Sequence, residues 1–164
     1  MPDISLAGFM GHLAGLDVSL RAETEHALER AARVVEAEAK AEIGHYQGQA
    51  GPFAAWAELA DATKDDRARK GYAENEPLLR EGTLRDSIHH AVEVTGATEG
   101  KAVIGSDSEI AVFQELGTQR IPPRSFLGGA LVRKSEQVTR ILGAGVAKAL
   151  VGEGVINGAL QIED

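Results

Sequence analysis

Two consecutive prolines, Pro122 and Pro123, restrict the backbone of this chain more tightly than any other part of its sequence. A residue that precedes proline is driven out of the helical region, so residues 118–121 are expected to be extended. Gly117 ends the apolar segment upstream, because glycine adopts positive φ without a steric cost. Ser125 follows the prolines as a candidate helix N-cap. The sequence therefore predicts a rigid corner that joins two regular elements.

Three charged residues, Glu115, Arg120 and Arg124, surround this corner. They can brace it internally as a local salt bridge, or they can contact another subunit, since the planar guanidinium fork of arginine suits carboxylates. The two interpretations are compatible, and both stay open at this point. The residues predicted to form a subunit or partner interface are Glu115, Gly117, Thr118, Arg120, Pro122, Pro123, Arg124 and Phe126.

Apolar residues recur every three or four positions over residues 20–46 and again over residues 125–150, which is the period of an α-helix. Asp17 or Ser19 is the expected N-cap of the first helix. In the second helix, Gly128 and Gly129 each cost roughly 1 kcal/mol relative to alanine. A close approach of another helix, a subunit contact or a strained helix start would each account for them.

Between these two predicted helices, apolar residues recur at every second position. Residues 88–95 alternate between apolar and polar, residues 96–100 form a turn, and residues 101–105 return, which predicts an antiparallel β-hairpin. The charged segment 61–72 is interpreted as a solvated helix or loop. Together these elements predict an α+β fold, with two long amphipathic helices packed on a small antiparallel sheet. The expected core residues are Leu28, Val35, Ile43, Ile88, Val92, Phe113, Leu116, Phe126, Leu131 and Val138.

The length of 164 residues predicts a single α+β domain, placed here at residues 17–152. Residues 1–16 are expected to be an N-terminal arm and residues 153–164 a C-terminal tail, both flexible alone and ordered on assembly. The apolar run 4–16 lacks the basic start of a secretory signal and is too short for a membrane span of ~20 residues. We therefore expect this run to be neither a secretory signal nor a membrane span, and we expect no membrane partner.

A net charge of −8 argues against wrapping a phosphate backbone, and the lack of cysteine excludes disulfides and thiolate metal sites. His89 and His90 are adjacent on a predicted strand and point to opposite faces, so they are poor ligands for one metal ion. Asp86, Ser87 and His89 contain the residue types of a hydrolase triad, but no nucleophile elbow accompanies them. We expect no enzyme activity, no metal and no cofactor.

Two blocks of the sequence carry a family resemblance. The later block has Glu115-Leu116-Gly117-Thr118, then Pro122-Pro123-Arg124-Ser125-Phe126-Leu127 and Ala130; the earlier block has Trp56-Ala57-Glu58-Leu59, Thr63, Lys64, Leu79, Gly82, Leu84, Arg85, Ser87 and Ile88. Over residues 53 to 131 the chain resembles the neck and tail-completion proteins of tailed bacteriophages, often labelled tail components. Ser125 departs from the pattern, because the family more often has proline there.

The resemblance implies a structural virion protein at the phage neck, which joins the head to the tail and is assembled in the bacterial host cytoplasm. Its partners would be further copies of itself in a ring, with six as the expected number, the head connector or stopper protein, and the tail tube or tail terminator protein. DNA would pass through the lumen without specific binding. The alternatives are a small α+β binding or regulatory module unrelated to virions, and a hydrolase that uses Asp86, Ser87 and His89.

Overall fold

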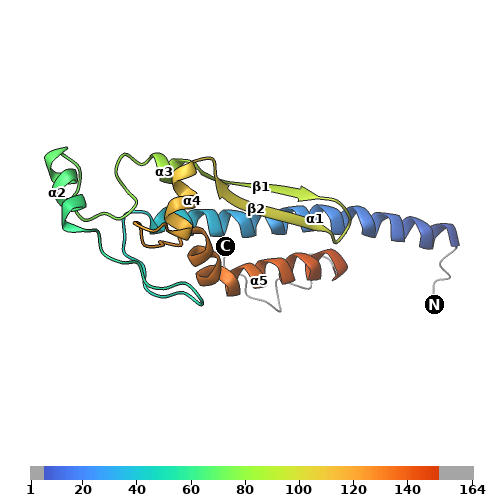
Figure 1. Cartoon of the computed structure of the whole chain (residues 1–164). Helices are drawn as coiled ribbons and strands as arrows, with labels where there is room; N and C mark the ends of the chain where they lie inside the picture. The colour runs from blue at the N-terminus through green and yellow to red at the C-terminus, as the bar shows by residue number, and fades with distance from the viewer. Residues whose placement is uncertain (1–5, 152–164) are drawn as a thin grey trace. The chain divides into compact units, whose positions relative to one another are not determined.

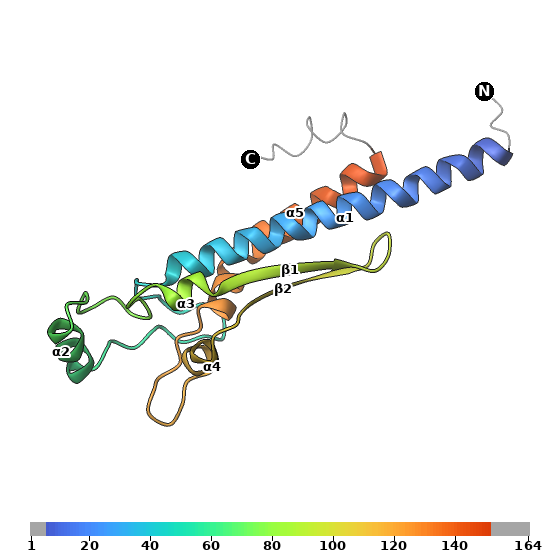
Figure 2. The same ribbon diagram turned by 90° about the horizontal axis from the view of Figure 1, so that it is seen from above.

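A computed structural model of the chain describes residues 6–151 (Figure 1). The elements in order are α1 (Leu6–Glu42), α2 (Asp61–Arg69), α3 (Thr83–Asp86), β1 (Ile88–Val94), β2 (Gly100–Ser106), α4 (Glu109–Leu116) and α5 (Leu127–Val151). The long helices α1 and α5 pack on a two-stranded antiparallel sheet, so the predicted α+β fold is confirmed (Figure 2).

The residues group into two compact units. Of the described residues, the first unit contains 6–32, 91–103 and 137–151, and the second contains 33–90 and 104–136. Helices α1 and α5 and the hairpin each contribute to both units. The predicted C-terminal tail, residues 153–164, lies outside the described residues.

Helix α1 begins much earlier than the sequence indicated. It starts at Leu6, so Asp17 and Ser19 lie inside the helix and cap nothing. The predicted helix start is therefore wrong, whereas the prediction that residues 1–16 form an arm that becomes ordered on assembly stays a prediction. Glycines are the weak helix formers in this stretch, and a helix already nucleated by packed residues extends at little cost. The helix ends at Glu42, and Gly44 follows with φ 98°.

In the first unit, small residues let the two helices approach closely. A Cβ atom added to Gly145 of α5 would lie 2.6 Å from the Cβ of Ala27 in α1. The buried side chains of this unit are mostly alanines: Ala27, Ala31, Ala32, Ala144 and Ala149, with Ile141. This agrees with a sequence that is rich in alanine and poor in aromatic residues, in which close helix packing replaces bulky side chains.

The hairpin was predicted correctly. Its exposure alternates along β1 from buried Ile88 to exposed His89, as expected for a strand with one covered face. Lys101 of β2 and Glu93 of β1 form an ion pair at 2.7 Å on the exposed side. In the first unit the turn contacts α1, because the Thr24 hydroxyl donates a hydrogen bond of 2.8 Å to the Ala97 carbonyl.

In the second unit the core is built from larger side chains. Its buried side chains include Val35, Ala39, Ile43, Trp56, Leu84, Ile88, Phe126 and Ala130. The charged segment 61–72 contains helix α2, one of the two forms expected for it. Arg67 of α2 is buried and donates hydrogen bonds to the carbonyls of Ala73 and Leu79, which ties α2 to the segment that follows it.

Gly128, at the start of α5, leaves room for an aromatic ring. A Cβ atom added there would lie 2.5 Å from the Cζ atom of Phe53, far inside van der Waals contact. Of the explanations considered for this glycine, the structure supports close packing. The approaching group is the side chain of a loop residue, whereas the close approach considered from the sequence was that of another helix.

Three of the ten expected core residues are placed wrongly. Phe113, Leu116 and Leu131 are 50 %, 73 % and 50 % exposed, respectively. Val35, Ile43, Ile88 and Phe126 are buried as predicted, whereas Leu28, Val92 and Val138 are half-buried. Helical spacing shows that apolar residues share a face, but it does not show whether that face is covered.

Glu42, at the end of α1, is an acidic residue buried in the second unit. It is 2 % exposed, and its Oε1 atom accepts a hydrogen bond of 2.6 Å from Arg133 of α5. Its Oε2 atom is buried and has no hydrogen-bond partner among the described residues. Burial raises the pKa of Glu42 to about 7, although the charge of Arg133 opposes that rise.

We expect the protein to become less stable as the pH rises from 4.5 to about 7. A raised folded-state pKa means that the folded chain holds a proton that the unfolded chain releases, so unfolding is favoured as the pH increases through this window. Glu36 has the opposite effect on stability. Because its folded-state pKa is lowered, it makes the protein less stable as the pH falls, and only below its usual pKa of 4.5. Burial alone would raise the pKa of Glu36, but its hydrogen bonds to Lys40 and His90 together lower it.

The measurement is thermal unfolding of the wild type and of Glu42→Gln between about pH 5 and pH 7.5. Glutamine stays neutral and still accepts a hydrogen bond from Arg133, so the variant should lose less stability across the window than the wild type. Parallel stability curves for the two proteins would show that Glu42 is not the titrating group.

Candidate functional site

The predicted corner is a folded loop of the second unit. Helix α4 ends at Gly117, whose φ of 75° is in the glycine-favoured region. A Cβ atom added there would lie 2.9 Å from both the Ile121 carbonyl oxygen and the Pro123 nitrogen. The Thr118 amide donates a hydrogen bond of 2.8 Å to the Ile121 carbonyl. Residues 118–121 therefore turn back on themselves, and the extended conformation expected for them is wrong.

Helix α5 is capped from a distance by Glu115 of α4. The Glu115 carboxylate accepts hydrogen bonds from the amides of Phe126, Leu127 and Gly128 at 2.8, 2.9 and 2.9 Å. These are the amides that the first helical turn leaves without internal partners, and a negative charge there is also favoured by the helix dipole. The Ser125 hydroxyl donates to the Glu115 carbonyl at 3.1 Å, so Ser125 is not the capping acceptor that the sequence suggested.

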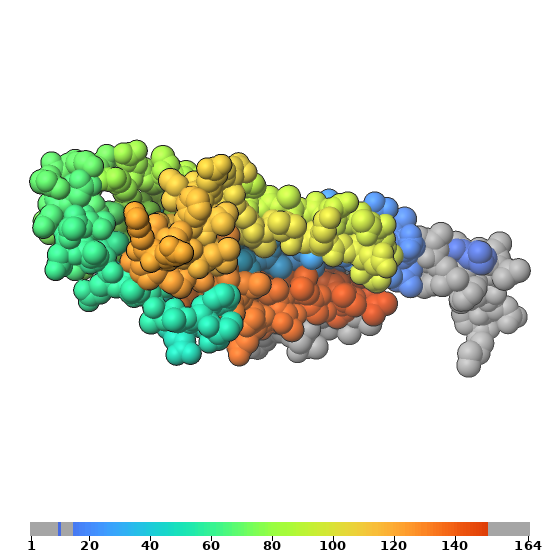
Figure 3. Space-filling model, in the orientation of Figure 1, coloured from blue at the N-terminus to red at the C-terminus, as the bar shows by residue number. Residues whose placement is uncertain are grey.

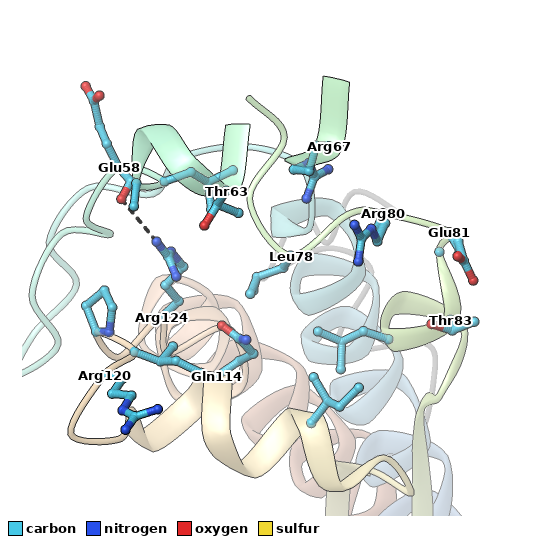
Figure 4. Close-up of a pocket in the computed structure, with 17 residues that line it drawn as sticks. Glu58, Thr63, Arg67, Leu78, Arg80, Glu81, Thr83, Gln114, Arg120 and Arg124 are labelled. Atoms are coloured by element: carbon cyan, nitrogen blue, oxygen red, sulfur yellow. Dashed lines mark hydrogen bonds between the residues drawn. The ribbon is translucent and has the colours of Figure 1, made fainter. Parts of the chain in front are cut away.

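Arg124 braces the corner from inside. It is 5 % exposed, and its guanidinium donates hydrogen bonds to the carbonyls of Ala57, at 2.9 Å, and Glu58, at 3.3 Å (Figure 4). Its amide donates to the Gln114 carbonyl at 2.6 Å. Burial lowers the pKa of the guanidinium below its usual value. Among the described residues this cation pairs with no carboxylate. It binds backbone carbonyls of a segment more than 60 residues upstream.

These contacts divide the eight residues predicted as an interface. Phe126 and Arg124 are buried and Glu115 is engaged in capping, so their roles in this conformation are internal. Arg124 and Phe126 must be removed from the predicted contact surface for that reason. The exposed members are Thr118, Arg120, Pro122 and Pro123, with Gly117 half-buried between α4 and the loop.

Helix α4 turns its apolar side outward. Its buried residue is Ala111, with half-buried Gln114 and Glu115 on the same side. The outward side carries the α4 apolar face, which we define as Ile110, Val112, Phe113 and Leu116; each is at least 50 % exposed. The corner and α4 lie toward the viewer in Figure 3, in amber and orange. Two residues of this face, Phe113 and Leu116, were expected from the sequence to lie in the core.

A cleft of about 800 Å³ lies beside the corner, and we call it the α4 cleft (Figure 4). Its apolar lining includes Leu59, Leu78, Leu84, Ile110, Ile121 and Pro122, and its charged lining consists of Glu58, Arg67, Arg80, Glu81, Arg120 and Arg124. No sequence pattern indicated this cleft, because its walls come from segments far apart in the sequence that helices and loops bring together.

Most of the charges in the cleft are already engaged. Arg80 pairs with Asp66 at 2.8 Å, and the Tyr72 hydroxyl donates to Glu81 at 2.6 Å. Arg120 is exposed and has no ion-pair partner among the described residues. Gln114 is also among the residues that line the cleft; its Oε1 atom is buried and accepts no hydrogen bond within the described part of the chain.

The hydrolase triad considered from the sequence does not assemble. The Ser87 hydroxyl donates to the Leu84 carbonyl at 2.7 Å and lies 2.6 Å from the Ser106 hydroxyl. His89 Nδ1 contacts the Ser87 carbonyl at 3.0 Å, so the imidazole does not reach the hydroxyl that it would have to activate. Asp86 pairs with Arg85 at 3.1 Å.

Within residues 6–151, no group of three or more histidine and acidic side chains is arranged to hold a metal ion. None of the helices described here has an apolar stretch long enough to cross a membrane. No family model, curated protein or solved structure matches the chain. The described residues present three surface features that are candidates for a functional role: the α4 apolar face, the exposed corner loop and the α4 cleft.

Proposed function

We propose that this chain is a structural, non-catalytic protein that assembles through the α4 apolar face and the exposed corner loop. The observation that carries the proposal is the outward orientation of four large apolar side chains on one short helix. A contiguous exposed apolar patch on a soluble protein marks an interaction site. Burying one such side chain contributes roughly 1.5–3 kcal/mol, so four of them can drive association.

The corner loop suits an interface for a different reason. Gly117, the prolines and the Thr118–Ile121 hydrogen bond hold it in one conformation. A loop that is ordered before association loses little conformational entropy when it binds. The loop therefore adds specificity beside the apolar face, and Arg120 supplies an exposed charge.

The resemblance to phage neck and tail-completion proteins supports a specific form of this proposal. The chain would form a ring, of six copies, at the head–tail joint of a virion, between the head connector and the tail tube. A ring requires a heterologous interface that closes on itself. The net charge of −8 is compatible with a lumen that DNA crosses without binding.

Replacement of Leu116 by lysine is expected to abolish assembly without unfolding the protein. The side chain is 73 % exposed, so the stability of the monomer should change by less than about 0.5 kcal/mol. Buried in an interface, an unpaired lysine would weaken self-association by at least about tenfold. The measurements are light scattering coupled to size-exclusion chromatography, thermal unfolding, and the yield of tailed particles in a complementation assay.

Val18→Lys is the matched control, since Val18 is 69 % exposed on α1 and outside the proposed interface. It should assemble as the wild type does. Normal assembly and normal particle yield from Leu116→Lys would refute the α4 interface. A wild type that stays monomeric at all concentrations, and produces no particle phenotype when deleted, would instead favour a small binding module.

A further inference from the structure

The α4 cleft has the chemistry of a peptide-binding site. Its volume of about 800 Å³ lies within the range of about 300–1,000 Å³ that is typical of ligand pockets. Apolar side chains form much of its lining, and Arg120 offers one cation that has no ion-pair partner within residues 6–151.

These features indicate which class of ligand the cleft would bind. A nucleic acid needs several cations, but Arg67, Arg80 and Arg124 are already engaged with carbonyls or with Asp66. A purely apolar ligand would make no use of the charge of Arg120. The cleft therefore fits an extended peptide with apolar residues and a carboxylate near one end.

The chain carries such a peptide in residues 152–164. This segment contains Leu160, Ile162 and Asp164 at alternate positions. In an extended backbone, alternate side chains point to the same side, so two apolar groups and one carboxylate would face the cleft together. Thirteen extended residues span about 40 Å.

We propose that residues 160–164 of one subunit occupy the α4 cleft of a neighbouring subunit, with Leu160 and Ile162 on its apolar lining and Asp164 paired with Arg120. This inference rests on the proposed assembly into a closed ring. In such a ring each subunit inserts a segment into the next one and receives a segment from the previous one, which is the heterologous contact that closure requires. The α4 apolar face and the tail–cleft contact are then neighbouring parts of the interface, since Ile110 belongs to the face and also lines the cleft.

A charge exchange in the full-length chain tests the pairing. Arg120→Asp and Asp164→Arg each place like charges together and should each weaken self-association by at least about tenfold. The double variant Arg120→Asp/Asp164→Arg restores opposite charges and should recover association close to the wild type. Arg140→Asp, at an exposed arginine of α5, and Glu163→Arg, whose side chain would face away from the cleft, are the controls and should leave association unchanged.

Mixing the two single variants distinguishes exchange between subunits from docking within one chain. In exchange between subunits, the unaltered tail of the Arg120→Asp variant meets the unaltered cleft of the Asp164→Arg variant. The substituted tail of the second variant likewise meets the substituted cleft of the first, so both contacts join opposite charges. An equimolar mixture should therefore associate as the wild type does, in alternating hetero-oligomers detectable by native mass spectrometry. Recovery in the double variant but not in the mixture would overturn the proposal, because each tail would then fill its own cleft.

The same series separates this inference from the proposed function. If the wild type and both single variants associate equally well while Leu116→Lys does not, the tail–cleft contact is refuted and the α4 interface stands. If the wild type does not self-associate at any concentration tested, both the tail–cleft contact and the α4 interface are refuted. Loss of association in either single variant without recovery in the double variant also contradicts the pairing.

Discussion

Arg124→Glu is expected to destabilise the second unit by about 3–5 kcal/mol, the cost of leaving a buried charge without compensation. The guanidinium is 5 % exposed and donates hydrogen bonds to the carbonyls of Ala57 and Glu58. A glutamate would direct carboxylate oxygens at those carbonyl oxygens, with no donor between them. Urea denaturation of the two proteins measures the difference.

Two further variants at the corner sharpen this test. Arg120→Glu makes the same charge change on an exposed side chain of the same loop, so its stability should stay within about 0.5 kcal/mol of the wild type. Arg124→Lys keeps the charge but loses the planar fork, and an intermediate loss is expected. Equal stability of Arg124→Glu and Arg120→Glu would contradict the internal brace and return Arg124 to the list of contact residues.

Glu115→Ala is expected to cost about 3 kcal/mol, since hydrogen bonds to a charged group contribute about 1.5–3 kcal/mol and this carboxylate accepts three. The amides of Phe126, Leu127 and Gly128 would lose their acceptor, and the start of α5 would fray. Hydrogen exchange of these three amides is the direct measurement, and their protection should fall further than that of amides in the middle of α5.

Glu115→Gln is the control that keeps the shape of the side chain but removes its charge. Its side chain fills the same space, but it presents one acceptor oxygen in place of two and carries no charge for the helix dipole. We expect it to lose roughly half of the stability that Glu115→Ala loses. Unchanged protection of the three amides in Glu115→Ala would mean that α5 is held by packing alone, without the cap.

Local patterns predicted the regular elements of this chain well. The alternation that begins at Ile88 located the hairpin, and three- and four-residue spacing located both long helices. The start of α1 was missed because the residues before Asp17 carry few polar side chains, so no amphipathic stripe marks them as helical. Helix ends depend on the balance between propensity and packing, and packing is not visible in local sequence.

The functional surfaces were harder to predict because they depend on contacts between distant residues. Glu115 caps a helix that begins 12 residues later, and only the turn at Gly117 brings the two together. The motif around Pro122 marked this region as a candidate interface, which stays a prediction, and within it the structure shows Arg124 buried and Arg120 exposed. Whether Phe113 and Leu116 face inward or outward depends on which side of α4 meets the rest of the unit, and no local pattern contains that information.

Because Phe53 packs against Gly128, substitutions at these two distant positions are expected to be coupled in evolution. The Phe53 ring occupies the space that any side chain at position 128 would need. A larger residue at 128 is thus acceptable only after position 53 has become small, and a smaller residue at 53 removes the reason for the glycine. In relatives that keep this architecture, positions 53 and 128 are therefore expected to change together. An aromatic residue at position 53 is then inherited with a glycine more than 70 residues away.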